Sequence, residues 1–109
     1  MFTIYAIHAP FADRLEEVTA QMQTLGAPVI RVVDCGDYYM ALEGSHRIAA
    51  AHALGMRPTL AVIAQDDEID ISEFDWFDSS NWDRTVYTGG EVAGELFSPQ
   101  QARAYSFRD

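Results

Sequence analysis

The fold of this chain is decided by the segment from Glu43 to Gly55, which reads EGSHRIAAAHALG. Gly44 marks a break in it, because glycine readily adopts the backbone conformations at which strands end. The run from Ser45 to Leu54 has the alanine content of a stable helix, and Gly55 stands at the usual C-terminal position. We therefore predict a strand that ends in a tight glycine turn and passes directly into a helix.

Four short stretches around this helix have the composition of β-strands. They are rich in β-branched, aromatic or other apolar residues and lie at residues 2–8, 28–34, 38–42 and 59–64. A turn at residues 35–37 predicts that the second and third strands form a hairpin. The last stretch, TLAVIA, is almost continuously apolar, which is the pattern of a strand covered on both faces.

A further helix is predicted between the first two strands. Asp13 occupies the position of an N-cap, and Glu16 follows three residues later, as in a capping box. Apolar residues then recur at helical spacing until Gly26, which supplies the stop. The expected order of elements in residues 1–65 is strand, helix, strand, strand, helix, strand.

The charge balance disfavours several classes of partner. The chain has 109 residues, with 17 acidic side chains against 7 basic ones, all of them arginine, and a formal net charge of -10. Binding to nucleic-acid backbones needs a basic surface, so direct nucleic-acid binding is disfavoured, and anionic membranes would repel this chain. No apolar run approaches the roughly 20 residues that span a bilayer, and the first residues lack the features of a secretory signal. We therefore expect a soluble, cytoplasmic protein.

The composition changes abruptly after Gln65. Acidic residues are frequent from there to the end of the chain, and many aromatic side chains are mixed among them. We therefore predict one domain, in which residues 66–109 form an acidic, aromatic extension packed on a core of about residues 1–65. The extension has three conspicuous aromatic residues: Trp76, Phe77 and Trp82. We expect them to close the open face of a small sheet, and the alternative is that they cover a ligand or form a protein interface. The residues from Ser98 to Gln101 (SPQQ) have the signature of a helix start, which predicts a short C-terminal helix.

Several other polar residues are assigned structural roles, so no protein-built metal site is predicted. The acids from Asp66 to Asp70 lack the spacing of a calcium loop and are expected in a solvated loop. His8, at a strand end, is interpreted as a surface residue that could face the same edge as Gly44. His52 is expected on a different face of its helix from His46, which excludes a shared metal. Cys35, the only cysteine, is interpreted as a partly buried filler.

The helix start at Ser45 contains the parts of an anion site. A helix N-terminus has unpaired amides and a partial positive charge, so basic residues in its first turn are penalised unless an anion is bound. His46 and Arg47 stand there, Gly44 allows close approach, and Ser45 and Arg47 can donate hydrogen bonds. The alternative is that Ser45 is only an N-cap, His46 is solvated and Arg47 pairs with a nearby acid. Spacing alone leaves both interpretations open.

Residues 39–51 (YMALEGSHRIAAA), the Leu54-Gly55 pair and the strand at 59–63 together resemble the core motif of the ParB and sulfiredoxin superfamily. The resemblance covers about residues 1–65 and implies an α+β fold with a small mixed sheet and two main helices. Members of that superfamily bind CTP or ATP, usually with magnesium, through a Gly-x-x-Arg turn. The resemblance therefore implies a nucleotide-phosphate site whose contacts are made by Gly44, Ser45, His46 and Arg47.

The chain departs from two groups of that superfamily. Sulfiredoxins have a catalytic cysteine directly after the glycine, where this chain has Ser45, so sulfinic acid reduction is disfavoured. Partition proteins have a Gly-Glu-Arg-Arg turn and a following helix-turn-helix domain, which the acidic residues 66–109 do not resemble. Centromere binding is disfavoured for the same reason.

Two kinds of function stay open. Free serine kinases of the superfamily have a turn similar to Asp-Gly-His-His-Arg, which residues 43–47 approximate. In a small phosphotransferase or nucleotidase, Glu43 would be the nearest candidate base or magnesium ligand. The alternative is a non-catalytic, acidic protein-interaction module on a degenerate version of the fold, with a protein partner or a second copy of the chain.

Overall fold

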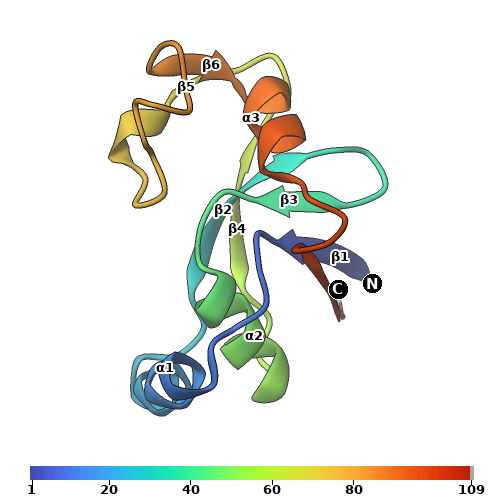
Figure 1. Ribbon diagram of the computed structural model, residues 1–109. Coiled ribbons are helices and arrows are strands. Elements are labelled where there is room, and N and C mark those ends of the chain that lie inside the picture. The colour runs from blue at the N-terminus through green and yellow to red at the C-terminus, as the bar shows by residue number, and fades with distance from the viewer. Residues whose placement is uncertain (109) are drawn as a thin grey trace.

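The computed structural model describes residues 1–108 and has the expected α+β architecture, with a mixed main sheet (Figure 1). Its elements are, in chain order, β1 (Phe2–Ala6), α1 (Ala12–Leu25), β2 (Val29–Asp34), β3 (Tyr39–Ala41), α2 (Ser45–Ala53), β4 (Thr59–Ile63), β5 (Glu68–Asp70), the 3-10 helix η1 (Ile71–Glu73), β6 (Val86–Thr88), α3 (Gly89–Leu96) and β7 (Arg103–Phe107). The elements from β1 to β4 have the predicted order.

The main sheet has five strands in the order β4-β2-β3-β1-β7. β2 and β3 form the predicted antiparallel hairpin, whereas β1 runs parallel to β3 and β4 runs parallel to β2. β7 pairs antiparallel with β1, from Phe2 opposite Phe107 to Ala6 opposite Arg103. The last strand therefore lies beside the first one, a pairing that our sequence prediction did not contain.

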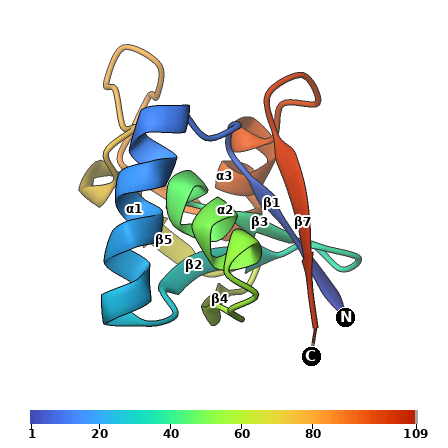
Figure 2. The same ribbon diagram turned by 90° about the horizontal axis from the view of Figure 1, so that it is seen from below.

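The two longer helices, α1 and α2, cover one face of this sheet (Figure 2). The core beneath them is built from fully buried side chains of the strands and of α2, among them Ile4, Ile30, Val32, Ile48 and Ala50. Alanine on the inner face of α2 allows the helix to pack closely, since small side chains leave little distance between backbone and sheet. This packing holds the first turn of α2 at the end of β3.

The start of α1 differs from the prediction. Its N-cap is Phe11, which makes no side-chain capping bond, and Asp13 lies inside the first turn. The predicted capping box of Asp13 and Glu16 is therefore wrong. The physical reason is a tertiary contact, because the Phe11 amide donates to His46 Nε2 at 3.0 Å and the helix starts there. Gly26 ends the helix as predicted, with φ of 84°.

The extension packs on the first half of the chain, as predicted, with β7 joining the main sheet and residues 71–97 lying against the face opposite α1 and α2. A second core cluster joins strand residues to residues of the extension, and its fully buried or nearly buried members are Val33, Met40, Leu42, Ile71, Phe74, Val92 and Ala93. Trp76, Phe77 and Trp82 pack on this cluster, and Trp76 Nε1 donates to the Leu42 carbonyl at 2.7 Å. These aromatic residues therefore close the open face of the sheet.

The internal structure of the extension differs from the prediction in two places. Part of the expected solvated loop from Asp66 to Asp70 is the strand β5, which pairs with β6. The predicted helix at Ser98 is only a turn, with the Gln101 amide donating to the Ser98 carbonyl at 3.0 Å, because the chain continues at once into β7. The helix of this region is α3, whose capping box is formed by Thr88 and Glu91.

The exposure of β4 contradicts its apolar sequence. We predicted a strand covered on both faces, but β4 is an edge strand whose side chains are exposed or half-buried, with Val62 52% exposed. The core beneath the helices reaches Leu60 and the cluster with the extension reaches Ile63, but the other side chains of β4 stay exposed. The apolar sequence of β4 therefore does not correspond to buried side chains.

Candidate functional site

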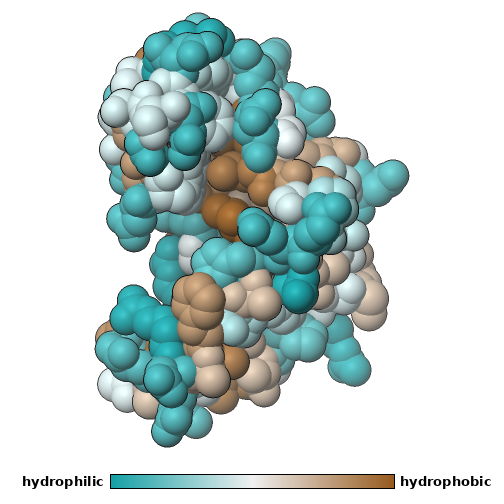
Figure 3. All heavy atoms as spheres, in the orientation of Figure 1, coloured by the Kyte–Doolittle hydropathy of each residue, from teal (hydrophilic) through white to brown (hydrophobic). Residues whose placement is uncertain are grey.

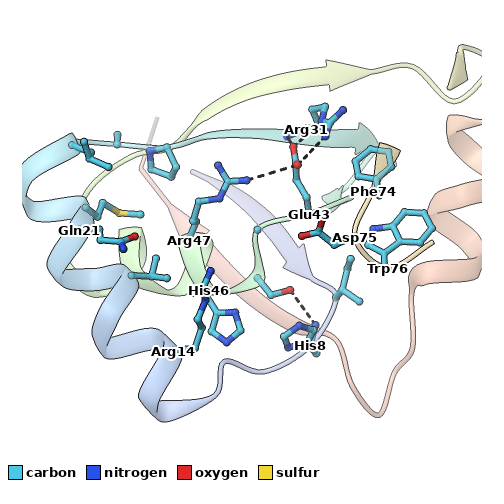
Figure 4. A pocket seen from close by; sticks show the side chains of 18 of the residues that line it. His8, Arg14, Gln21, Arg31, Glu43, His46, Arg47, Phe74, Asp75 and Trp76 are labelled. Carbon is cyan, nitrogen blue, oxygen red and sulfur yellow. Dashed lines mark hydrogen bonds and ion pairs between the residues drawn. The ribbon is translucent and has the colours of Figure 1, made fainter. Parts of the chain in front are cut away.

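A groove of about 620 Å³ opens between α1, the turn from β3 into α2, and the start of the extension. Figure 3 shows the surface hollowed between the lobe that contains the extension and the lobe that contains α1. All the residues predicted for the site line this groove: Glu43, Gly44, Ser45, His46 and Arg47 (Figure 4). His8 lines it as well, whereas His52 lies elsewhere, beside the rings of Tyr105 and Phe107.

Gly44 makes the turn into α2. It is the N-cap of the helix and has left-handed backbone angles, with φ of 75° and ψ of 33°. A Cβ atom at this position would lie 2.8 Å from Ile30 Cδ1 and 3.2 Å from Arg47 Nη2. The position therefore requires glycine for two reasons: the left-handed backbone conformation, and the space that the Ile30 and Arg47 side chains fill.

The first turn of α2 has neither a capping side chain nor an acidic residue. The first hydrogen bond of the helix runs from the Ile48 amide to the Gly44 carbonyl at 2.8 Å. The amides of the preceding residues belong to the set that an α-helix leaves without internal partners, and the helix dipole places partial positive charge there. The start of α2 is thus electropositive and lies in the wall of the groove.

The alternative interpretation made Ser45 the N-cap of the helix, but its side chain makes no capping hydrogen bond. Ser45 is the first helical residue, it is only 6% exposed, and its Oγ accepts a hydrogen bond from the His8 amide at 3.4 Å. The side chain therefore ties the end of β1 to the start of α2. This long hydrogen bond links two walls of the groove.

His46 is half-buried and not solvated. Its Nε2 accepts the hydrogen bond from Phe11, and its ring lies 5.5 Å from the His8 ring and 5.4 Å from the Phe11 ring, measured between centroids. Burial lowers the pKa of His46, and the charges of His8 and Arg14 lower it further. His46 therefore acts as a neutral acceptor that positions α1, and it adds no full charge to the groove.

Arg47 is held only by long contacts. Its Nη1 donates to the Val29 carbonyl at 3.3 Å, its Nη2 lies 3.8 Å from Glu43 Oε1, and its side chain is 42% exposed. Long contacts of this kind in a half-exposed side chain contribute little free energy. The guanidinium can therefore move toward a ligand at small cost.

Glu43 is held firmly by Arg31. Arg31 Nε donates to Glu43 Oε2 at 2.8 Å and Nη2 donates to Oε1 at 3.0 Å, in the forked geometry that arginine forms with carboxylates. The hydrogen bond from Arg31 is the main cause that lowers the pKa of Glu43. A carboxylate with a lowered pKa is a weak base, so the geometry argues against proton abstraction by Glu43 in this conformation.

The sequence prediction missed Arg31 and most of the residues that the extension brings to the groove, and it gave contact of Trp76 with a ligand only as an alternative. Arg31 also pairs with Glu73 of η1, and its guanidinium lies 4.2 Å from the centre of the Phe74 ring. Asp75 and Trp76 complete this wall (Figure 4). Only the position of Arg31 between the inward-facing Ile30 and Val32 could have indicated that its side chain points to the extension face.

No match was found in comparisons with protein families, with curated proteins or with solved structures. Within residues 1–108, no cluster of histidine, cysteine, aspartate or glutamate has a geometry that could hold a metal ion. In the same residues, no helix combines the length and the apolar character that crossing a bilayer requires. The thiol of Cys35 is half-buried, and burial raises its pKa, which is typical of an unreactive cysteine.

Proposed function

We propose that this protein binds a phosphorylated small molecule, in the first instance a nucleotide, with the phosphate at the start of α2. One observation carries the proposal: α2 begins in the groove at a left-handed glycine, with no capping side chain and no acid in its first turn. Backbone amides in this arrangement bind phosphate groups in many unrelated proteins. The resemblance to the ParB and sulfiredoxin superfamily supports the choice of CTP or ATP as ligands.

Arg47 would supply the charged contact. Its guanidinium lies over Gly44, next to the first turn of α2, so a modest movement brings it onto an anion bound there. The groove volume of about 620 Å³ lies within the range of ordinary small-molecule sites, about 300–1,000 Å³. The acids of the opposite wall, Glu73 and Asp75, would then face the part of the ligand distant from the phosphate.

A phosphotransferase or nucleotidase reaction is the catalytic form of this proposal. Arg47 and the amides of α2 would stabilise the charge on the transferred phosphoryl group. Magnesium would enter with the nucleotide, since this ion is usually bound by substrate phosphates and only one or two carboxylates. Glu43 fits the role of such a carboxylate better than that of a base, because Arg31 keeps its pKa low.

A second candidate is a non-catalytic protein-interaction module. The observation in its favour is that the arginines of the groove already have acidic neighbours: Arg14 pairs with Glu17, Arg31 with Glu43 and Glu73, and Arg47 with Glu43. A groove neutralised in this way needs no ligand for its stability. This candidate function predicts no response to nucleotides.

Thermal unfolding in the presence of ligands distinguishes the two functions. The wild-type chain would be heated with CTP, ATP, ADP and inorganic phosphate, each with and without magnesium. A ligand at about 100 times its Kd stabilises the folded state by about 2.7 kcal/mol, which is a shift of about 10 °C in Tm for a domain of this size. We expect such a shift with at least one nucleotide and its loss in Arg47→Ala.

The matched control is Arg103→Ala, which removes an exposed arginine of β7 outside the groove. This variant should respond to the ligand as the wild type does. An unchanged Tm with every nucleotide and with phosphate would reject the site. A shift that survives in Arg47→Ala would place the ligand elsewhere.

A further inference from the structure

The outer edge of β4 is uncharged and has no neighbouring strand. β4 stands at one end of the main sheet and pairs only with β2 (Figure 2). The stretch from Thr59 to Gln65 contains no charged residue, in a chain with a net charge of -10. Natural proteins commonly protect such edges with charged residues, proline or bulges, and β4 has none of these between Thr59 and Ile63.

The backbone of β4 presents a defined set of groups at this edge. The Thr59 amide donates to the Pro28 carbonyl at 2.9 Å, so Thr59 faces β2. The direction of the backbone amides and carbonyls alternates along a strand. Those of Ala61 and Ile63 therefore also face β2, whereas those of Leu60 and Val62 point away from the sheet. The outward amides and carbonyls of Leu60 and Val62 have no hydrogen-bond partner in the described residues. Water hydrates this row in a single chain, and another extended strand matches the spacing of its alternating donors and acceptors.

We propose that a second copy of this chain pairs with β4, antiparallel, about a two-fold axis at Ala61. Leu60 of each copy then lies opposite Val62 of the other, and the two residues exchange amide-to-carbonyl bonds on both sides of the axis. On the helix face of the sheet, the 52% exposed Val62 packs beside the partner's Leu60. The two five-stranded sheets become one continuous sheet.

The pairing with its axis at Ala61 is more favourable than the two neighbouring registers, in which the axis lies at Leu60 or at Val62. An axis at Leu60 would place Val62 opposite Pro58, which has no amide hydrogen to donate. An axis at Val62 would place Leu60 opposite Ala64, whose amide already donates to Asp67 Oδ2 at 3.1 Å. The edge is therefore self-complementary in a single register, which favours a second copy over an unrelated peptide.

Electrostatics gives this dimer a characteristic salt dependence. Two chains of net charge -10 repel each other, but the paired edges themselves carry no charge. Salt screens the repulsion over about 8–10 Å at 0.1–0.15 M and leaves the backbone bonds of the seam intact. The dimer should therefore strengthen as the salt concentration rises, unlike an association held by ion pairs.

Sedimentation equilibrium of the full chain over a wide concentration range tests the dimer. We expect the wild type to show a monomer–dimer equilibrium, and Val62→Lys to weaken the association at least about tenfold, because the two-fold axis doubles the effect of each substitution. Val86→Lys is the matched control, since it places the same charge at an exposed strand valine of the separate β5–β6 sheet. A wild type that stays monomeric, or a dimer that persists in Val62→Lys, would overturn the proposal.

Cross-linking tests the register. In a Cys35→Ser background, Ala61→Cys should form a disulfide-linked dimer on mild oxidation, because residues facing each other at a non-hydrogen-bonded position have Cα atoms about 4.5 Å apart. Val86→Cys in the same background should stay monomeric. A dimer seen by sedimentation that fails to cross-link through Ala61→Cys would contradict the pairing described here.

Discussion

At the scale of single residues, Gly44 decides how the chain leaves β3 and enters α2. Its left-handed conformation turns the backbone, and the absence of a side chain leaves room for Ile30 and for the Arg47 guanidinium. Both requirements concern the same atom, the Cβ that glycine lacks. The geometry of the groove wall therefore depends on this one position.

Gly44→Ala should reduce the free energy of unfolding by about 2 kcal/mol or more, because it adds left-handed strain and a contact with the buried Ile30. Denaturant unfolding measures the change. Gly94→Ala is the control, since a Cβ there meets nothing within 4 Å and the position is helical. That variant should be neutral or slightly more stable, by up to about 1 kcal/mol. Equal effects of the two substitutions would contradict the role assigned to Gly44.

At the scale of elements, the starts of α1 and α2 are coupled through His46. The ring belongs to α2, but its Nε2 accepts the hydrogen bond of the residue that caps α1. Neither helix has a local side-chain cap, so this contact takes the place of one. It works only while the imidazole is neutral, since a protonated ring has no free acceptor.

This coupling predicts a pH dependence of stability. The pKa of His46 in the folded protein is lower than its ordinary value of 6.5, chiefly through burial. The unfolded state therefore binds the proton more readily, and the contribution of His46 is fully present above pH 6.5 and is lost as the pH falls toward the folded-state value. The difference in unfolding free energy between wild type and His46→Gln, measured from pH 7.5 to 5.5, should shrink or reverse on acidification.

The control for this prediction is His52→Gln, which removes the other histidine of α2, an exposed one outside the groove. The difference in unfolding free energy between wild type and His52→Gln should not shrink or reverse on acidification. If His46→Gln lost stability on acidification as steeply as the wild type does, the interpretation of the His46–Phe11 contact would be wrong.

At the scale of the whole molecule, the extension and the first half share a core. Val33 and Met40 of the main sheet, with Leu42 just after β3, are buried in one cluster with extension residues. Those residues include Ile71, Phe74 and Val92. Arg31 and Glu73 add an ion pair across the same boundary. The central strands of the sheet are thus covered by α1 and α2 on one face and by residues 71–97 of the extension on the other, while β7 of the extension is itself a strand of the sheet.

A shared core predicts that the two parts unfold together. Both tryptophans, Trp76 and Trp82, lie in the extension, so fluorescence reports on the extension while far-UV circular dichroism reports on the whole chain. The two transitions should coincide in midpoint and in steepness. A fluorescence transition at clearly lower denaturant would show that the extension unfolds by itself.

Local sequence patterns predicted the elements from β1 to β4, but they did not predict which other parts of the chain pack around these elements. The composition of β4 suggested burial, and the SPQQ motif at Ser98 suggested a helix, yet both depend on what the rest of the chain places nearby. Of the groove, the segment from Glu43 to Arg47 was found because it is contiguous in sequence. Arg31 and Glu73 were missed because they come from separate elements that meet only in the folded chain.

The sequence by itself determined the glycine turn, the helix after it and the absence of an acid from the first turn of that helix, because these depend on backbone conformation and on residues within one helical turn. The tertiary structure alone decided the protonation and the hydrogen-bond partners of the side chains at this turn. It made His46 a neutral acceptor for α1, engaged Ser45 with the end of β1, and set Glu43 against Arg31. The physical reason is that the protonation and hydrogen bonding of a side chain depend on burial and on partners distant in the sequence.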